Sequence, residues 1–138
     1  MNMKTLTATI SVFALTCGHL VAQTVATPTV ETAAPVVVKT VPEAGSKDLA
    51  AGVVEIKVTF SKEMTDGSWS WSSAWKDSTP EIIGKPRYEA DRKTCVLKAK
   101  LEAGKTYGYW INSGNFKNFK DRQGRPAVPY LLVFQTRG

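Results

Sequence analysis

Val54-Glu55-Ile56-Lys57-Val58-Thr59-Phe60 alternates apolar and polar side chains without interruption. Successive side chains of a β-strand point to opposite faces, so this stretch gathers its apolar residues on one face and its polar residues on the other. β-Branched residues and phenylalanine, which favour strands, supply the apolar face. The stretch therefore predicts a half-buried strand.

The same alternation recurs through the rest of the chain. In residues 95–101, CVLKAKL, apolar residues again occupy every second position, which directs one face inward and leaves Val96 and two lysines outside. Further candidate strands cover residues 36–41, 68–75, 82–88, 106–111 and 128–136. Glycine, proline and aspartate turns separate the strands, and no stretch has the period of an amphipathic helix. About seven short strands predict an all-β fold, an immunoglobulin-like antiparallel β-sandwich of two sheets.

The N-terminal residues have the pattern of an export signal. Lys4 precedes an apolar run over residues 6–15, and Ala22 offers a small residue for signal-peptidase cleavage. Threonine, serine and histidine make this segment too polar for a transmembrane helix, which needs about 20 mainly apolar residues. We expect residues 1–22 to be a signal peptide, residues 23–37 an extended linker, and residues 38–138 the β-sandwich domain of a secreted or cell-envelope protein, with no transmembrane segment after processing.

Cys17 raises the alternative of lipid attachment at a cysteine behind the apolar run. A lipoprotein signal usually has leucine three residues before that cysteine and a small residue immediately before it, whereas this chain has Ala14 and Thr16. Ordinary secretion is the favoured prediction.

Cleavage after Ala22 would change the inventory of reactive residues. His19 and Cys17 would leave with the signal, so that Cys95 would be the one cysteine of the mature chain and no internal disulfide would be possible. Loss of Lys4 lowers the basic residues from 18 to 17 against 12 acidic residues, a net charge of +5. A modest excess of this kind is typical of a soluble surface and does not predict nucleic-acid binding.

Several local patterns, in order, resemble one family of extracellular domains. They are VPEAGSKD (41–48), IKVTFSKEM (56–64), LEAGKTY (101–107), NFKDRQG (118–124) and FQT (134–136). Together they resemble bacterial Ig-like domains of the SbsA surface-layer type over about residues 38–137. The resemblance implies a fold and a location at the cell surface or outside the cell, where such domains act as spacers or adhesive modules. It implies no catalytic residue.

Tyr107 is predicted to form a tyrosine corner. Gly104 suits a turn that needs a positive φ, and Tyr107 then enters a strand in which its ring can be buried while its hydroxyl bonds back to the turn. This arrangement is typical of Greek-key sandwiches.

Catalysis finds little support in the residues. Once His19 is removed with the signal peptide, the commonest general base and metal ligand at neutral pH is missing. Cys95 shares the inward face of its strand, which predicts an inert thiol. Asp121 is the best candidate for a calcium ligand, but basic neighbours favour a solvated hairpin in which it caps the turn. We therefore expect no cofactor and no metal; a small hydrolase using carboxylates is the alternative.

The tryptophans are the candidate contact surface for a ligand. Trp69, Trp71 and Trp75 have the same parity in residues 67–75, so a continuous strand would present all three on one face. We expect at least one to be buried in the core and Trp75 to lie near the surface. Trp110 takes the opposite side from Tyr107, Tyr109 and Ile111, where it faces solvent or packs across Gly108. Exposed aromatic rings stack on sugars or anchor proteins, so the expected partner is a protein or a cell-envelope polysaccharide.

A basic cluster is the second candidate surface. Lys117, Lys120, Arg122 and Arg125 fall within nine residues and are candidate contacts for a polyanion such as an acidic cell-wall polymer. A weak nucleic-acid binder is the remaining alternative, although no nucleic-acid partner is expected. The sequence favours a non-catalytic module for binding or structural spacing.

Overall fold

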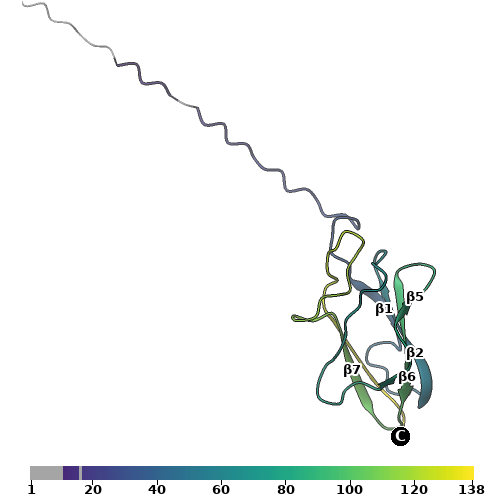
Figure 1. The fold of residues 1–138 in the computed structure, drawn as a ribbon. Coiled ribbons are helices and arrows are strands. Elements are labelled where there is room, and N and C mark those ends of the chain that lie inside the picture. Colours follow the sequence, from purple (N-terminus) through teal and green to yellow (C-terminus); the bar gives the residue numbers. More distant parts are fainter. Residues whose placement is uncertain (1–10, 16) are drawn as a thin grey trace, which may run out of the picture.

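The strands of the chain form two antiparallel sheets (Figure 1) in the computed structural model, which describes residues 11–15 and 17–138. The larger sheet has the order β1-β2-β6-β4, with β5 also paired to β6, and the smaller sheet has the order β3-β7-β8. The strands are β1 Val37–Val41, β2 Gly52–Phe60, β3 Trp71–Ser73, β4 Glu81–Ile82, β5 Arg87–Tyr88, β6 Thr94–Leu101, β7 Thr106–Ile111 and β8 Tyr130–Gln135. No helix occurs in the described ranges. The predicted all-β sandwich is confirmed.

One predicted strand is divided in two. Residues 82–88 form the short strands β4 and β5, which both pair with β6. Gly84 adopts a φ of +75° between them, and a residue in that region turns the chain out of an extended path. The described residues therefore contain eight strands in place of the predicted seven.

The predicted strand over residues 68–75 is wrong at both ends, because only Trp71–Ser73 is a strand. After Ser73 the chain bends, and the Ser78 hydroxyl accepts the backbone N–H groups of Ala74 and Trp75 at 2.9 and 3.2 Å. A serine side chain that bonds nearby backbone groups offers an alternative to the ladder of a sheet. The turn takes Trp75 out of the strand.

The two long strands, β2 and β6, pair with each other, and their inward side chains form most of the larger sheet's part of the hydrophobic core. Their register places Ile56 opposite Leu97 and Val58 opposite Cys95, and these four side chains are fully buried. The alternation predicted from both stretches thus produces a single apolar face. Burial of such side chains contributes about 1.5–3 kcal/mol each for the larger aliphatic ones.

Val96 departs from that alternation. It lies on the outer side of β6, as predicted, but it is only 2% exposed. Lys57 of β2 and Arg87 of β5 are its register partners on either side. Ion pairs with neighbouring glutamates, at 2.5 and 2.9 Å, hold these two cations on the outer face. Their aliphatic stems can therefore cover Val96, as long charged side chains commonly do.

Aromatic contacts join the two sheets. Phe119, from the loop between β7 and β8, is fully buried, and its ring lies 5.0 Å from that of Phe60 and 5.7 Å from that of Trp71. Trp71 in turn meets Tyr109 edge to face at 5.4 Å. Tilted and edge-to-face pairs at these separations are favourable geometries for aromatic rings. This cluster fixes one end of the sandwich.

The tyrosine corner is confirmed. Gly104 has a φ of +67°, and the buried Tyr107 accepts a 2.8 Å hydrogen bond at its hydroxyl from the backbone N–H of Glu102. The bond ties the turn before β7 to the ring that packs inside.

The N-terminal part of the described chain leaves the sandwich at the end opposite the C-terminus (Figure 1). Residues 17–28 extend away from the domain, whereas residues 29–36 contact it. Pro35 is buried, and its carbonyl accepts the N–H of Val128 at 2.9 Å. Within the expected signal peptide, residues 1–10 and 16 lie outside the described residues. None of the described segments is a helix long and apolar enough to cross a membrane.

Substitution Tyr107→Phe tests the corner. We expect a loss of about 1 kcal/mol in the free energy of unfolding, because the backbone N–H of Glu102 loses its acceptor. Urea denaturation followed by tryptophan fluorescence measures the change.

Tyr109→Phe is the matched control. Tyr109 is equally buried, but among the described residues its hydroxyl has no hydrogen-bond partner. Its removal should therefore leave stability unchanged or raise it. Equal losses for the two variants would contradict the assignment.

Candidate functional site

A groove runs along the open side of the sandwich, where the edge strand β3 of the smaller sheet faces β4 and β5 of the larger one. Its volume is about 540 Å³. Its lining residues are Trp69, Ser70, Trp71, Ser72, Ser73, Ile82, Pro86, Leu97, Phe116 and Asn118. Trp69 and Trp71 are half-buried, whereas Phe116 is 56% and Ile82 46% exposed. The groove is thus mainly apolar and aromatic, with serine hydroxyls and one carboxamide among its polar groups.

A buried asparagine fixes the loop that carries Phe116 and Asn118. Asn112 ends β7 with a φ of +54°, a conformation that asparagine tolerates better than most residues. Its side chain accepts the N–H of Phe119 at 2.9 Å and donates to the carbonyls of Phe119 and Ala127 at 2.9 and 3.0 Å. Farther along the loop, the Asn118 N–H bonds the Ser70 hydroxyl at 3.0 Å. The wall of the groove is therefore held in place before any ligand arrives.

A second hollow, of about 440 Å³, adjoins the groove on the outer side of β3. It is lined by Ser72, Ser73, Trp110, Ser113, Gly114, Asn115, Phe116 and Pro129. Ser72, Ser73 and Phe116 belong to both hollows. The edge strand therefore has a recess on each of its faces.

Trp75 lies apart from both hollows. Its side chain is on the surface, and the residue is 43% exposed. A Cβ placed on Gly108 would lie 2.3 Å from the Trp75 ring, so the ring rests directly on the backbone of β7 and only glycine fits beneath it. The single aromatic face predicted for Trp69, Trp71 and Trp75 does not form, because the chain turns after Ser73. Trp110, predicted to face solvent or to cover Gly108, is half-buried beside the outer hollow.

The predicted basic cluster is divided among different environments. Arg122 pairs with Glu63 at 3.1 Å, and Arg125 pairs with Asp121 at 2.8 Å. Lys117 is exposed on the loop after Phe116, and Lys120 is half-buried. The two arginines are engaged within the molecule, which leaves Lys117 as the exposed member without an ion pair among the described residues.

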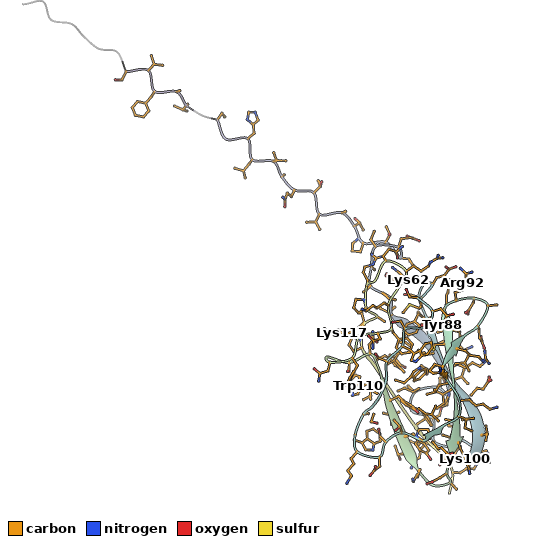
Figure 2. The ribbon with its side chains drawn as sticks, in the orientation of Figure 1. Lys62, Tyr88, Arg92, Lys100, Trp110 and Lys117 are labelled. Atoms are coloured by element: carbon orange, nitrogen blue, oxygen red, sulfur yellow. The ribbon has the colours of Figure 1, made fainter. Side chains whose placement is uncertain are left out.

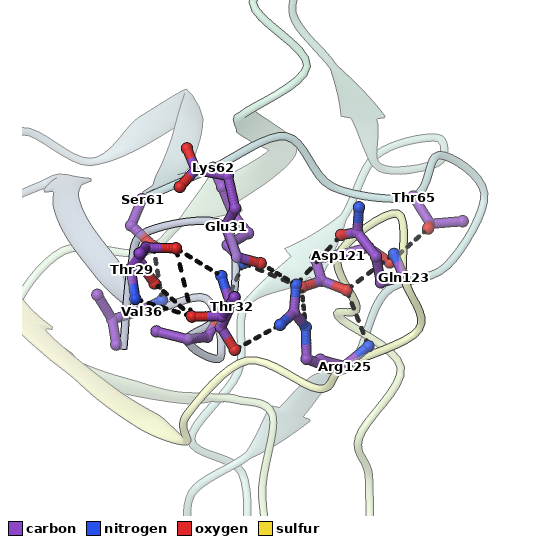
Figure 3. A network of polar contacts seen from close by, with 11 residues as sticks. Thr29, Glu31, Thr32, Val36, Ser61, Lys62, Thr65, Asp121, Gln123 and Arg125 are labelled. Carbon is purple, nitrogen blue, oxygen red and sulfur yellow. Dashed lines mark hydrogen bonds and ion pairs between the residues drawn. The ribbon is translucent and has the colours of Figure 1, made fainter. Parts of the chain in front are cut away.

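Asp121 forms the buried polar centre at the N-terminal end of the sandwich (Figure 3). Its carboxylate is fully buried and accepts from Lys62 Nζ at 3.2 Å and Arg125 Nε at 2.8 Å. The other oxygen caps the turn by accepting the backbone N–H groups of Gln123 and Arg125 at 3.0 and 2.9 Å. The capping role was predicted, but the solvated hairpin was wrong, because Lys62 reaches this carboxylate from the loop after β2.

The same two cations hold the N-terminal segment on the domain. Lys62 Nζ donates to the carbonyls of Ala33 and Glu31 at 2.6 and 3.0 Å, and the Arg125 guanidinium donates to the carbonyls of Glu31 and Thr32. Asp121 neutralises both cations, so that a buried carboxylate anchors residues 31–33 to the sandwich. Burial alone would raise the pKa of Asp121, but the Arg125 N–H, Lys62 and the Arg125 guanidinium lower it below its ordinary value.

A third hollow, of about 640 Å³, has two carboxylates among its lining residues. Asp66 and Glu89 both line it, together with Tyr88, Arg92 and other residues. Glu89 accepts from Lys57 at 2.5 Å, however, and Asp66 accepts the N–H of Gly67 at 2.7 Å. Both carboxylates are engaged in structural bonds, which weighs against the hydrolase alternative.

Cys95 is buried in the core, as predicted. Burial raises the pKa of its thiol to about 12, even though the indole of Trp71 acts in the opposite direction. A thiol of that pKa is protonated at neutral pH and is a poor nucleophile. The described residues contain no group of three or more histidine, cysteine, aspartate or glutamate side chains arranged to hold a metal ion.

Sequence reasoning missed most of the groove. Ile82, Pro86 and Asn118 carry no local signal, because they reach the site through the pairing of β4 and β5 with β6 and through the loop after β7. Phe116 directly precedes the basic cluster in the sequence, but its place against β3 depends on the loop after β7, where Ser113 bonds the Phe116 backbone. Knowing which strands become sheet edges would have been needed to find these residues.

Comparison with known proteins gives one match. A family model described as bacterial Ig-like domain matches residues 31–136, which includes the segment anchored by Lys62 and Arg125. No curated protein and no solved structure matches the chain. The SbsA-type subfamily stays a prediction.

Substitution Asp121→Asn tests the buried centre. We expect it to lower the free energy of unfolding at neutral pH by about 3 kcal/mol, because two partly buried cations lose their counter-ion. Arg122→Ala is the control, since its exposed pair with Glu63 should contribute less than about 1 kcal/mol.

The pH dependence gives a second readout for the same carboxylate. Because the folded-state pKa of Asp121 is below the unfolded value of about 3.9, its stabilisation is present above that value and is lost as the pH falls through the folded pKa. Denaturation curves between neutral and acidic pH should therefore converge for the wild type and Asp121→Asn. A constant difference down to the lowest pH would contradict the assignment.

Proposed function

Because the chain belongs to the bacterial Ig-like domain family, we propose that it is a non-catalytic module of a secreted or cell-surface protein and that the groove beside β3 binds its ligand. The ligand is a protein or a cell-envelope polysaccharide. Export by the signal peptide of residues 1–22 is part of the proposal.

The groove itself carries the proposal. Ligand sites are typically concave and mainly apolar, with a few fixed polar groups that give orientation. The rings of Trp69, Trp71 and Phe116 supply the apolar surface, and the loop that carries Phe116 is fixed by buried hydrogen bonds. A site that is already ordered loses less conformational entropy when it binds.

The groove also has the residues expected at binding centres. Tryptophan is enriched among the residues that contribute most to binding, and such residues lie in partly desolvated pockets. Trp69 meets both conditions, since it is half-buried and lines the groove. Trp75 follows β3, and its exposed ring rests on β7 outside the groove, so it serves as the comparison for Trp69.

Substitution Trp69→Ala tests this function. The domain is titrated with a panel of soluble peptidoglycan fragments, envelope glycans and displayed peptides, and binding is followed by tryptophan fluorescence. We expect Trp69→Ala to weaken the binding of a panel ligand by roughly tenfold or more, the loss typical of a central aromatic residue.

Trp75→Ala is the matched control. It removes a ring of the same kind outside the groove, so it should change the affinity by less than about twofold. An affinity that depends on Trp75 and not on Trp69 would move the site away from the groove.

A further inference from the structure

We propose that the groove takes an extended peptide segment of a partner protein, which adds to β3 as a fourth strand of the smaller sheet. This inference rests on the proposed function, because it names the ligand class for the same groove.

The free backbone groups of β3 provide the first argument. Hydrogen bonds between the Ser70 carbonyl and the Asn112 N–H, and between the Ala74 N–H and the Gly108 carbonyl, show that even-numbered residues point toward β7. In an antiparallel pair the alternate residues point the other way. The N–H and C=O groups of Trp71 and Ser73 are therefore directed outward along the open edge, and no other described strand pairs with β3 there.

The opposite edge of the same sheet is closed. Residues 45–49 run beside β8, where the N–H of Gly45 bonds the Val133 carbonyl at 2.7 Å and the N–H of Leu49 bonds the Gln135 carbonyl at 3.3 Å. The N–H of Gln135 in turn bonds the Ser46 carbonyl at 2.7 Å. The chain covers one edge of the smaller sheet with its own backbone and leaves the other available.

The edge strands of the larger sheet, β1, β4 and β5, carry features that discourage pairing with another chain, and β3 differs from them. Proteins usually guard exposed edges with proline, lysine or a β-bulge. β1 has a break in register between Val37 and Lys39, and prolines precede both β4 and β5. β3 has the sequence Trp-Ser-Ser, with no proline, lysine or bulge, and its length of three residues is its one protection.

The two hollows match the alternation of an added strand. Successive side chains of a strand point to opposite faces. On one face of β3 they would enter the groove beside Trp71, Ile82 and Pro86, and on the other the recess beside Trp110, Phe116 and Pro129. Recognition by strand addition uses backbone bonds for affinity and pockets for alternate side chains for specificity. The peptide should therefore have apolar residues at successive positions across β3.

The charges at the rim indicate the flanks of that peptide. Lys85 follows Gly84 beside Pro86, and Lys117 follows Phe116; both are exposed and form no ion pair among the described residues. Figure 2 shows Lys117 on the same side of the sandwich as Trp110. Glu81, next to the lining residue Ile82, is a carboxylate at the same rim, so the two lysines outnumber it and the rim carries a net positive charge. Aspartate or glutamate at the ends of the apolar segment would complement them.

The same charges argue against a second copy of this chain as the occupant. Pairing of two β3 edges would bring identical rims, each with Lys85 and Lys117, toward one another. Like charges across an interface disfavour such a pair. A partner with an acidic, extended segment has no such repulsion.

The test uses a displayed library of short peptides with apolar residues at successive positions and acidic ends, alongside the glycan panel. Ser73→Pro removes the outward N–H without removing a bond to β7, a position at which an edge strand tolerates proline. We expect a selected peptide to bind Ser73→Pro about tenfold or more weakly than the wild type, a factor that corresponds to about one strong hydrogen bond. Ser73→Ala, which keeps the N–H, should bind more tightly than Ser73→Pro.

N-methylation of the peptide keeps the test valid if Ser73→Pro does not fold. Methyl groups on the amides that face β3 should abolish binding, whereas methyl groups on the intervening amides should not. This alternation is the signature of an added strand.

Other results would overturn the inference in distinguishable ways. A glycan that binds in a Trp69-dependent manner, while no peptide binds, would keep the groove as the site but refute a peptide ligand. A peptide insensitive to Ser73→Pro and to N-methylation would refute strand addition. A concentration-dependent dimer in sedimentation that Ser73→Pro abolishes would make a second copy the occupant. Failure of every peptide and glycan would refute both the ligand class and the proposed function.

Discussion

Face-to-face packing of two sheets of unequal width governs the rest of this structure. The inward side chains of β2 and β6 meet those of β7 and β8, and Phe119 fills the space between Phe60 and Trp71. In the larger sheet β4 and β5 both pair with β6, and Ile82 of β4 and Pro86 before β5 line the groove together with Trp71 of β3. The groove lies at this open side of the sandwich, so the packing that stabilises the domain also creates its candidate binding surface.

Buried polar residues hold the loops around that packing. Asn112 bonds three backbone groups of the loop after β7 and so fixes Phe119 in the core, and Ser113 bonds the backbone of Phe116 in the groove wall. At the other polar centre, Asp121 balances Lys62 and Arg125, which bond the carbonyls of residues 31–33. Each centre is satisfied by several hydrogen bonds, the condition under which a buried polar group stabilises a fold.

The sequence predicted what depends on local pattern. Alternation in residues 54–60 and 95–101 identified the central strands, and Gly104 with Tyr107 identified the corner. Local pattern could not predict contacts between segments that are distant in the sequence. Lys62 bonds Asp121, 59 residues later in the chain, and Ile82 lines the groove opposite β3. The strand through Trp75 failed because a serine hydroxyl competed for the backbone N–H groups that would have continued it.

Amide hydrogen exchange measured by NMR spectroscopy tests the central claim, an ordered sandwich whose smaller sheet has an open edge at β3, most directly. Ser72 bonds Trp110 by register, so its amide should exchange slowly, together with the amides of β2, β6 and β7. The amides of Trp71 and Ser73, on either side of it, should exchange rapidly. Slow exchange at Trp71 and Ser73 in the isolated domain would show that the edge is already occupied and would contradict the account.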